Sequence, residues 1–135
     1  MIRGVGVPDI GLTRKKAEEA LKSGTVPIPK GWKMLIALPV FEERATESGI
    51  ILTDATKKAE EVASVLGYVM AMGDDAYKDT NKFPTGPWCS IGDFVIMRSY
   101  SGTRFVVGGH EFRLINDDSV EAVVQDPRGI KRKFI

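Results

Sequence analysis

Six short apolar segments, separated by turn-forming residues, dominate the pattern of hydrophobic and polar positions from Trp32 onward. Pro39 indicates the end of the first segment or an edge position, because proline cannot donate to a sheet. Gly67 indicates a bulge or a bend in the second, and Gly108-Gly109 is a two-residue hairpin signal. The pattern therefore predicts an all-β fold, a small sandwich or barrel. The expected strands cover residues 33–41, 64–73, 93–98, 103–107, 110–115 and 119–124.

Residues 1–30 differ from the rest because glycine and proline interrupt them repeatedly, which is typical of an extension. Thr13 is predicted to cap a short helix that runs through Lys22, with Gly24 just past its end. Three basic residues, 14–16, would occupy the positive end of that helix's dipole. The helix is therefore predicted to be weak, and the extension to be partly flexible.

The stretch ESGIILTD places Ile50, Ile51 and Leu52 in a row within a polar environment. Neighbours in a strand alternate faces, so the three cannot all enter one half-buried sheet face. They fit a short strand buried on both faces. They equally fit an exposed segment that carries an apolar plug to a partner's groove, because the flanks EERATES and TDATKKAEE are charged. The pattern alone leaves both interpretations open.

Composition adds limits to this picture. The chain has 135 residues, 43% hydrophobic and 27% charged, which indicates one soluble globular domain. No apolar run is long enough to cross a bilayer, and no hydrophobic secretory segment opens the chain. Cys89 is the only cysteine, so a reducing compartment is expected. The net charge of +1 conceals an acidic body between basic ends. Those ends, including residues 131–133, are read as solvated, or alternatively as contacts to nucleic acid or neighbouring subunits.

The inventory of reactive side chains argues against an enzyme. One histidine and one cysteine cannot supply the usual zinc ligand sets. Cys89 and His110 could pair in principle, but no activating motif surrounds them, so a packed thiol is favoured. The chain contains no phosphate-binding loop and no nucleophile elbow. The adjacent carboxylates at 74–75 and 117–118 are typical of turns. No catalytic residue, metal site or cofactor is predicted for this chain.

The order of these elements resembles the GroES-type co-chaperonins. In that family a strand leads into a mobile loop carrying GI[VI]L, then a strand, a roof hairpin, a VGDxV[IL][FM] motif and a closing strand pair. The resemblance covers roughly residues 30–125 and rests on order and spacing rather than on one specific motif. The matching positions are Gly49, Ile50, Ile51 and Leu52 in the loop, Gly92, Asp93, Val95, Ile96 and Met97 in the body, and Val120, Ala122 and Val123 in the last strand.

This resemblance implies a GroES-like bent β-barrel at residues 31–125, between the extension of residues 1–30 and a basic tail at 126–135. It implies a mobile loop, a roof hairpin and assembly into a dome-shaped ring, a heptamer. The dome would cap a GroEL-type chaperonin in a nucleotide-dependent way and enclose unfolded protein clients in the cytoplasm. Gly49, Ile50, Ile51 and Leu52 would dock to the apical domains. ATP or ADP and Mg would be bound by the partner chaperonin, not by this chain.

Several stretches depart from the family's usual form. Residues 1–30 have no counterpart there. The segment 74–90 contains Tyr77, Phe83 and Trp88, an unusual roof for which ordinary loop packing is favoured. FPTGPWCSIGD and SYSGTRF resemble phage-encoded members, which implies a host or phage-encoded chaperonin and the host cytoplasm. The alternative function is a virion or nucleic-acid-associated β-barrel that uses the basic tails. The fold type also occurs in zinc-dependent alcohol dehydrogenases, whose ligands this chain lacks.

Overall fold

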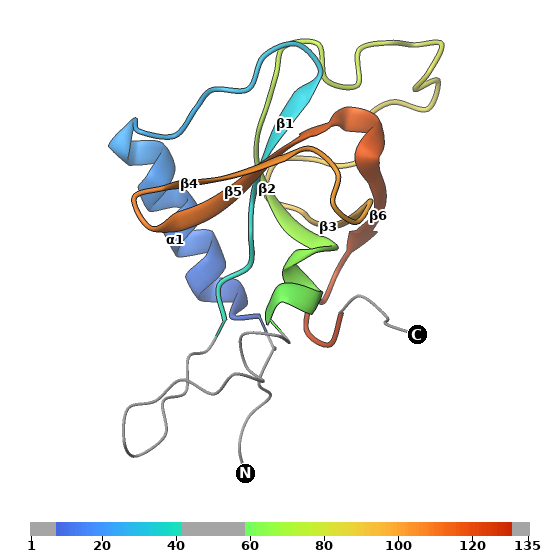
Figure 1. Ribbon diagram of the computed structural model, residues 1–135. Coiled ribbons are helices and arrows are strands. Elements are labelled where there is room, and N and C mark those ends of the chain that lie inside the picture. The colour runs from blue at the N-terminus through green and yellow to red at the C-terminus, as the bar shows by residue number, and fades with distance from the viewer. Residues whose placement is uncertain (1–7, 42–58, 131–135) are drawn as a thin grey trace, which may run out of the picture.

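One antiparallel sheet of six strands organises the chain (Figure 1). The computed structural model describes residues 8–41 and 59–130. The strands lie in the order β4-β5-β1-β2-β3-β6, so β1 is near the middle and β4 and β6 are the two ends. The elements are α1 (Ile10–Ser23), β1 (Lys33–Ala37), β2 (Leu66–Met72), β3 (Phe94–Met97), β4 (Thr103–Val107), β5 (His110–Asn116), the 3-10 turn η1 (Asp117–Ser119) and β6 (Val120–Val124).

The strands confirm the prediction of an all-β GroES-like fold from short apolar segments. All six form, and β1 ends before Pro39 as expected. Val107 pairs with His110 across a two-residue turn. Both turn residues, Gly108 and Gly109, have positive φ (57° and 80°), which glycine adopts without a steric cost.

Gly67 does not carry the predicted bulge. Leu35 pairs with Ala71 and Ile36 with Val69, so the extra residue in β2 is Met70. Gly67 has another role, because a Cβ there would overlap the Cγ2 atom of Ile36. The glycine allows β1 and β2 to approach closely at this point, which local sequence patterns do not reveal.

Helix α1 begins earlier than predicted. Its cap is Asp9, whose Oδ1 accepts the backbone N–H of Leu12 at 2.9 Å. Thr13, the expected cap, lies inside the helix and is 1% exposed. Gly24 ends the helix in the left-handed conformation (φ 71°), as predicted. Because the helix starts at Ile10, residues 14–16 come after its first turn and not at the positive end of its dipole. Ala17 is buried against the sheet, so packing also stabilises the helix.

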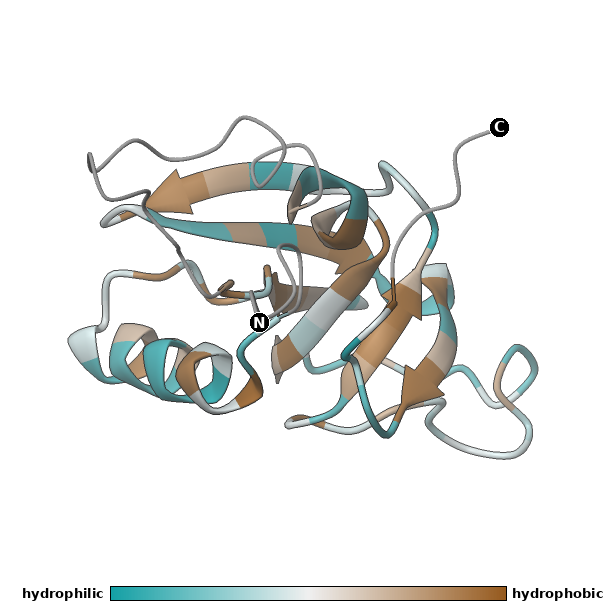
Figure 2. Cartoon of the chain, turned by 90° about the horizontal axis from the view of Figure 1, so that it is seen from below, coloured by the Kyte–Doolittle hydropathy of each residue, from teal (hydrophilic) through white to brown (hydrophobic). Residues whose placement is uncertain are grey.

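The sheet is covered on both faces, which explains why β1 is almost entirely buried. On one face, α1 packs with Leu35, Ala37, Met70 and Phe112. In Figure 2 the strands are mostly brown, whereas α1 is mostly teal and white. The larger core lies on the other side and consists of Met34, Ile36, Leu38, Ala63, Val69, Ala76, Tyr77, Phe83, Cys89, Val95, Met97, Ile115 and Val120.

The connection between β2 and β3 is built from turns, and residues 73–93 contain no strand. The roof hairpin that the resemblance implied is therefore absent from this connection, because its aromatic residues fold back onto the core. Tyr77 and Phe83 are buried and meet edge to face, with ring centroids 4.9 Å apart. Trp88 contacts both rings but stays 43% exposed. Ordinary loop packing, the favoured interpretation, is confirmed for Tyr77 and Phe83.

Tyr77 joins this connection to the turn η1. Its hydroxyl donates to the backbone oxygen of Asp117 at 2.8 Å, and its own N–H donates to Asp117 Oδ2 at 3.0 Å. Tyr77 has a left-handed backbone (φ 60°), which is unfavourable for a bulky residue and is held by these bonds. Burial raises the pKa of its hydroxyl well above the ordinary value. The hydroxyl is therefore a permanent donor at physiological pH.

We expect Tyr77→Phe to lower the free energy of unfolding by about 1–2 kcal/mol, because the Asp117 oxygen is left buried without its donor. Chemical denaturation with the midpoint and slope measured separately checks this. Tyr68→Phe is the matched control, since within residues 8–41 and 59–130 no hydrogen bond is recorded for the Tyr68 hydroxyl. Equal stability losses in the two variants would contradict the assignment of this bond as structural.

Candidate functional site

The residues predicted to dock to a partner, Gly49, Ile50, Ile51 and Leu52, lie in segment 42–58, outside the described residues. The structure does describe both ends of that segment. Phe41, before it, packs against a cluster that contains Val62, Leu66 and Phe94. The residues that flank the segment on its two sides therefore meet in one hydrophobic cluster beside β2 and β3.

The N-terminal end of the segment is held by α1. The N–H of Asp9 donates to the Val40 oxygen at 2.7 Å, and Pro8 forms an isolated antiparallel bridge with Phe41. The Thr13 hydroxyl donates to the Asp9 oxygen at 2.6 Å and accepts the Val40 N–H at 2.9 Å. This buried hydroxyl is satisfied both as donor and as acceptor. It therefore joins α1 to the strand exit, the residues 38–41 that follow β1.

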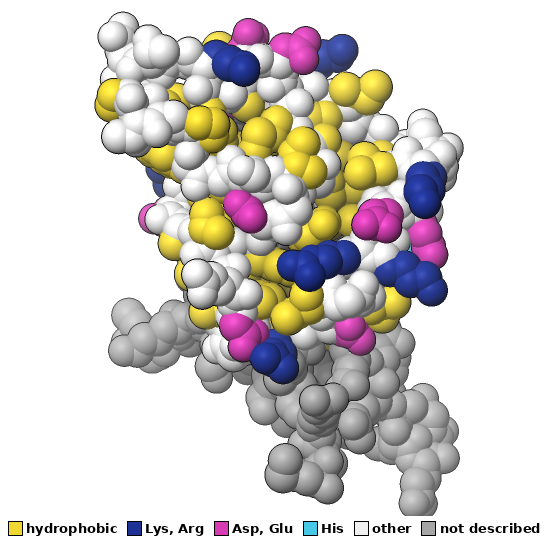
Figure 3. Space-filling view, turned by 180° about the vertical axis from the view of Figure 1, so that it is seen from behind, with side chains coloured by type: hydrophobic (Ala, Val, Ile, Leu, Met, Phe, Trp, Pro, Cys, Tyr) yellow, Lys and Arg dark blue, Asp and Glu magenta, His cyan; other side chains and the backbone are white. Residues whose placement is uncertain are grey.

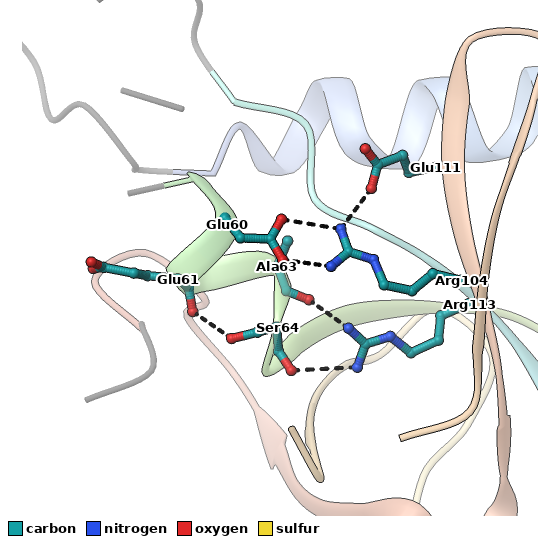
Figure 4. A network of polar contacts seen from close by, with 7 residues as sticks. All are labelled: Glu60, Glu61, Ala63, Ser64, Arg104, Glu111 and Arg113. Carbon is teal, nitrogen blue, oxygen red and sulfur yellow. Dashed lines mark hydrogen bonds and ion pairs between the residues drawn. The ribbon is translucent and has the colours of Figure 1, made fainter. Parts of the chain in front are cut away.

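The C-terminal end is held by Arg113, which is fully buried in β5. Residues 59–63 form a helical turn that leads into β2. The two terminal nitrogens of Arg113 donate to the carbonyl oxygens of Ala63 (3.2 Å) and Ser64 (3.3 Å) at the end of that turn (Figure 4). Desolvation lowers the pKa of Arg113, and the neighbouring Arg104 adds to that effect.

Arg104 holds the same turn from β4. It is paired directly across from Arg113, and like charges in that position repel. Glu60 offsets the repulsion with a two-pronged ion pair to Arg104 (2.6 and 3.2 Å), and Glu111 adds a second at 2.7 Å (Figure 4). The hydrogen bond from Arg104 is the largest cause that lowers the pKa of the Glu60 carboxyl. Charge and hydrogen bonding therefore both fasten the turn to the β4–β5 hairpin.

The reactive side chains considered in the sequence analysis are among the described residues. Within residues 8–41 and 59–130, no three His, Cys, Asp or Glu side chains gather as a metal site. Cys89 is buried with its sulfur 3.4 Å from the Tyr77 hydroxyl, and burial raises its pKa. The prediction of a packed thiol is thus confirmed, while His110 begins β5 in the hairpin. No helix among the described residues is long and apolar enough to cross a membrane.

Hydrophobic side chains are also exposed on the surface. Figure 3 shows them gathered over the middle of one face, with charged residues scattered between them and along the rim. Several large ones are strongly exposed, among them Ile28 (77%), Trp32 (59%) and Ile91 (62%). Where such side chains are contiguous, they are typical of contacts with other chains.

The sequence analysis missed the residues that hold the ends of segment 42–58. Arg104 and Arg113 are equally distant from the hairpin turn at 108–109, so their cross-strand pairing could have been read from the sequence. Thr13 was noticed only as a helix cap. Its contact with Val40 depends on how the helix lies against the sheet, and no local pattern shows that.

Comparison with known proteins gives a consistent result. The sequence profile of the family described as "Chaperonin 10 Kd subunit" matches residues 28–124. A protein of Petrotoga mobilis named "Co-chaperonin GroES" is 32% identical over 98 residues, which cover 73% of this chain and 96% of the relative. Proteins of the same name from Caldicellulosiruptor saccharolyticus (33% over 98 residues, 73% and 96%) and Streptomyces coelicolor (29% over 91 residues, 67% and 83%) are also similar.

The Glu60–Arg104 ion pair predicts a small pH dependence of stability. A carboxyl whose pKa is lowered by folding stabilises the protein above its unfolded pKa, near 4.5, and this contribution is lost as the pH falls through the lowered value. We expect the difference in unfolding free energy between wild type and Glu60→Gln to be largest at neutral pH and to vanish in acid. Because Glu60 is half-exposed, the difference should stay below about 1 kcal/mol.

The measurement is urea unfolding of both proteins from pH 7 to pH 3. Glu121→Gln serves as the control, because it removes an exposed carboxylate on β6 away from Arg104. A Glu60→Gln difference that does not change with pH would show that the ion pair does not stabilise the turn.

Proposed function

The chain belongs to the chaperonin 10 kDa subunit family and is a GroES-type co-chaperone, and from this we propose that it caps a GroEL-type chaperonin ring in a nucleotide-dependent way. The observation that carries the proposal is the family match over residues 28–124, with GIIL placed between β1 and β2. Gly49, Ile50, Ile51 and Leu52 then dock into an apolar groove of the partner. The cap encloses unfolded protein clients.

The energetics of such a segment suit a reversible lid. Burying three large aliphatic side chains contributes on the order of 1.5–3 kcal/mol each. Ordering the backbone costs about 1–2 kcal/mol per residue fixed, so one segment binds weakly. Several copies on one ring raise the effective concentration and produce firm but releasable binding. The contacts of Val40 and Ala63 support this reading, because residues that are already fixed add nothing to the ordering cost.

We propose that the subunits form a ring, a heptamer as in the GroES-type pattern. The sheet has two end strands, β4 and β6, and end strands offer backbone groups for pairing with another chain. Val123 is an exposed apolar side chain on β6, and Ile28 and Trp32 are exposed apolar side chains before β1. Both features support association with further copies of the chain.

In this proposal the partner chaperonin, and not this chain, binds and hydrolyses the nucleotide. ATP or ADP and Mg are bound by the chaperonin, and this chain contributes the lid, acting in the cytoplasm. Because two stretches resemble phage-encoded members, the partners to test are a bacterial host chaperonin and a phage-encoded one. No catalytic role is assigned to this chain.

We expect Ile50→Ser combined with Leu52→Ser to abolish capping while the ring stays intact, because the substitutions remove the apolar contact that the proposal assigns to these residues. Native mass spectrometry of the protein alone, and then with a GroEL-type chaperonin and ADP, measures both properties. Wild type should form a ring that joins the chaperonin only when nucleotide is present.

Leu21→Ser is the matched control, since this aliphatic side chain is 43% exposed on α1 and lies on neither end strand. That variant should still cap. Capping by the Ile50/Leu52 variant would remove these residues from the docking site. A wild-type protein that ignores both chaperonins would overturn the proposed function and direct attention to the basic tails.

A further inference from the structure

Helix α1 lies outside the family match, which begins at residue 28. It nevertheless contacts the strand exit that leads to segment 42–58. We propose that α1 is a positioning element, in which Thr13 fixes the N-terminal end of the docking segment and thereby raises affinity for the chaperonin. This inference rests on the proposed function and adds a role for residues 8–24.

The contacts at Thr13 are specific rather than general packing. One hydroxyl bonds both to its own helix, at the Asp9 oxygen, and to the strand exit, at the Val40 N–H. A helix that only covered the sheet would need apolar residues on its inner face, as Ala17 and Ala20 provide. Thr13 is instead a 1% exposed polar residue whose hydroxyl both donates and accepts a hydrogen bond. These two bonds fix the position of Val40 relative to the start of α1.

The first turn of α1 is joined to both ends of the segment. Ile10 packs against the cluster of Val62, Leu66 and Phe94, where Phe41 also lies. Val62 belongs to the turn that Arg104 and Arg113 hold. Moving the start of α1 would therefore disturb the N-terminal end directly and the C-terminal end through shared packing. In Figure 1 the start of the helix lies at the same end of the sheet as the turn of residues 59–63.

Fixing Val40 before docking lowers the conformational entropy that the chain loses when it binds. An end that is fixed before docking has already lost the conformational freedom that docking would otherwise remove. Loosening Val40 and Phe41 adds residues to the part that must be ordered on the partner. A net hydrogen bond corresponds to about a twofold to tenfold change in an equilibrium constant. On a ring with several copies the effect is multiplied, because every docked segment bears it.

The test compares Thr13→Val, which keeps the shape but removes both hydrogen bonds, with Thr13→Ser, which keeps the hydroxyl. Thr25→Val is the control, since that exposed hydroxyl bonds only near the helix end, to Ser23. Two quantities are measured: exchange of the Val40 amide proton in the free protein, and affinity for a GroEL-type chaperonin with ADP. Thr13→Ala, which removes the same hydroxyl, repeats the test should Thr13→Val fail to fold.

We expect Thr13→Val to speed Val40 exchange about tenfold and to weaken chaperonin binding by about fivefold or more, with the ring intact. Thr13→Ser and Thr25→Val should match wild type in both. Unchanged binding despite faster exchange would overturn the inference, as would unchanged exchange. If wild type binds no chaperonin, the proposed function fails, and this outcome is distinct because the exchange data still report whether Thr13 holds Val40.

Discussion

The buried guanidinium of Arg113 is the interaction on which the rest of the structure depends. A cation removed from water is costly unless its donors are satisfied. The peptide oxygens of Ala63 and Ser64 satisfy the two terminal nitrogens, whereas the buried Nε has no partner among the described residues. Those two residues are separated from the start of β2 only by Val65, so the bonds help to set where β2 starts. Strand β1 then lies between β2 and β5 with both of its faces covered. One side chain thus links the hairpin, the turn after segment 42–58 and the centre of the sheet.

The residues on the two sides of segment 42–58, which carries GIIL, are held by two different elements of the structure. Helix α1 holds the exit through Thr13, and the β4–β5 hairpin holds the return through Arg104 and Arg113. Both ends share the hydrophobic cluster around Phe41 and Val62. The residues that flank segment 42–58 on both sides are thus fixed by the scaffold itself.

The connection between β2 and β3 shows how a small chain gains core without additional strands. Tyr77 and Phe83 turn inward and enlarge the core beneath the sheet. Asp117, in η1, receives two hydrogen bonds from Tyr77, and Asp118 forms an ion pair with Lys82 at 2.7 Å. The exposed ion pair adds little stability, so the buried tyrosine contacts hold this connection in place.

Much of the fold follows from local pattern. The six strands, the turn at Gly108-Gly109 and the helix end at Gly24 were predictable, because period-two hydrophobicity and glycine conformations are properties of neighbouring residues. The order of motifs likewise indicated the family. Only the tertiary structure decided that Asp9 caps α1, that Met70 forms the bulge, and that Thr13, Arg104 and Arg113 hold the ends of segment 42–58. Those choices depend on contacts between residues up to fifty positions apart, such as Arg113 with Ala63, whose energies exist only after the sheet has formed.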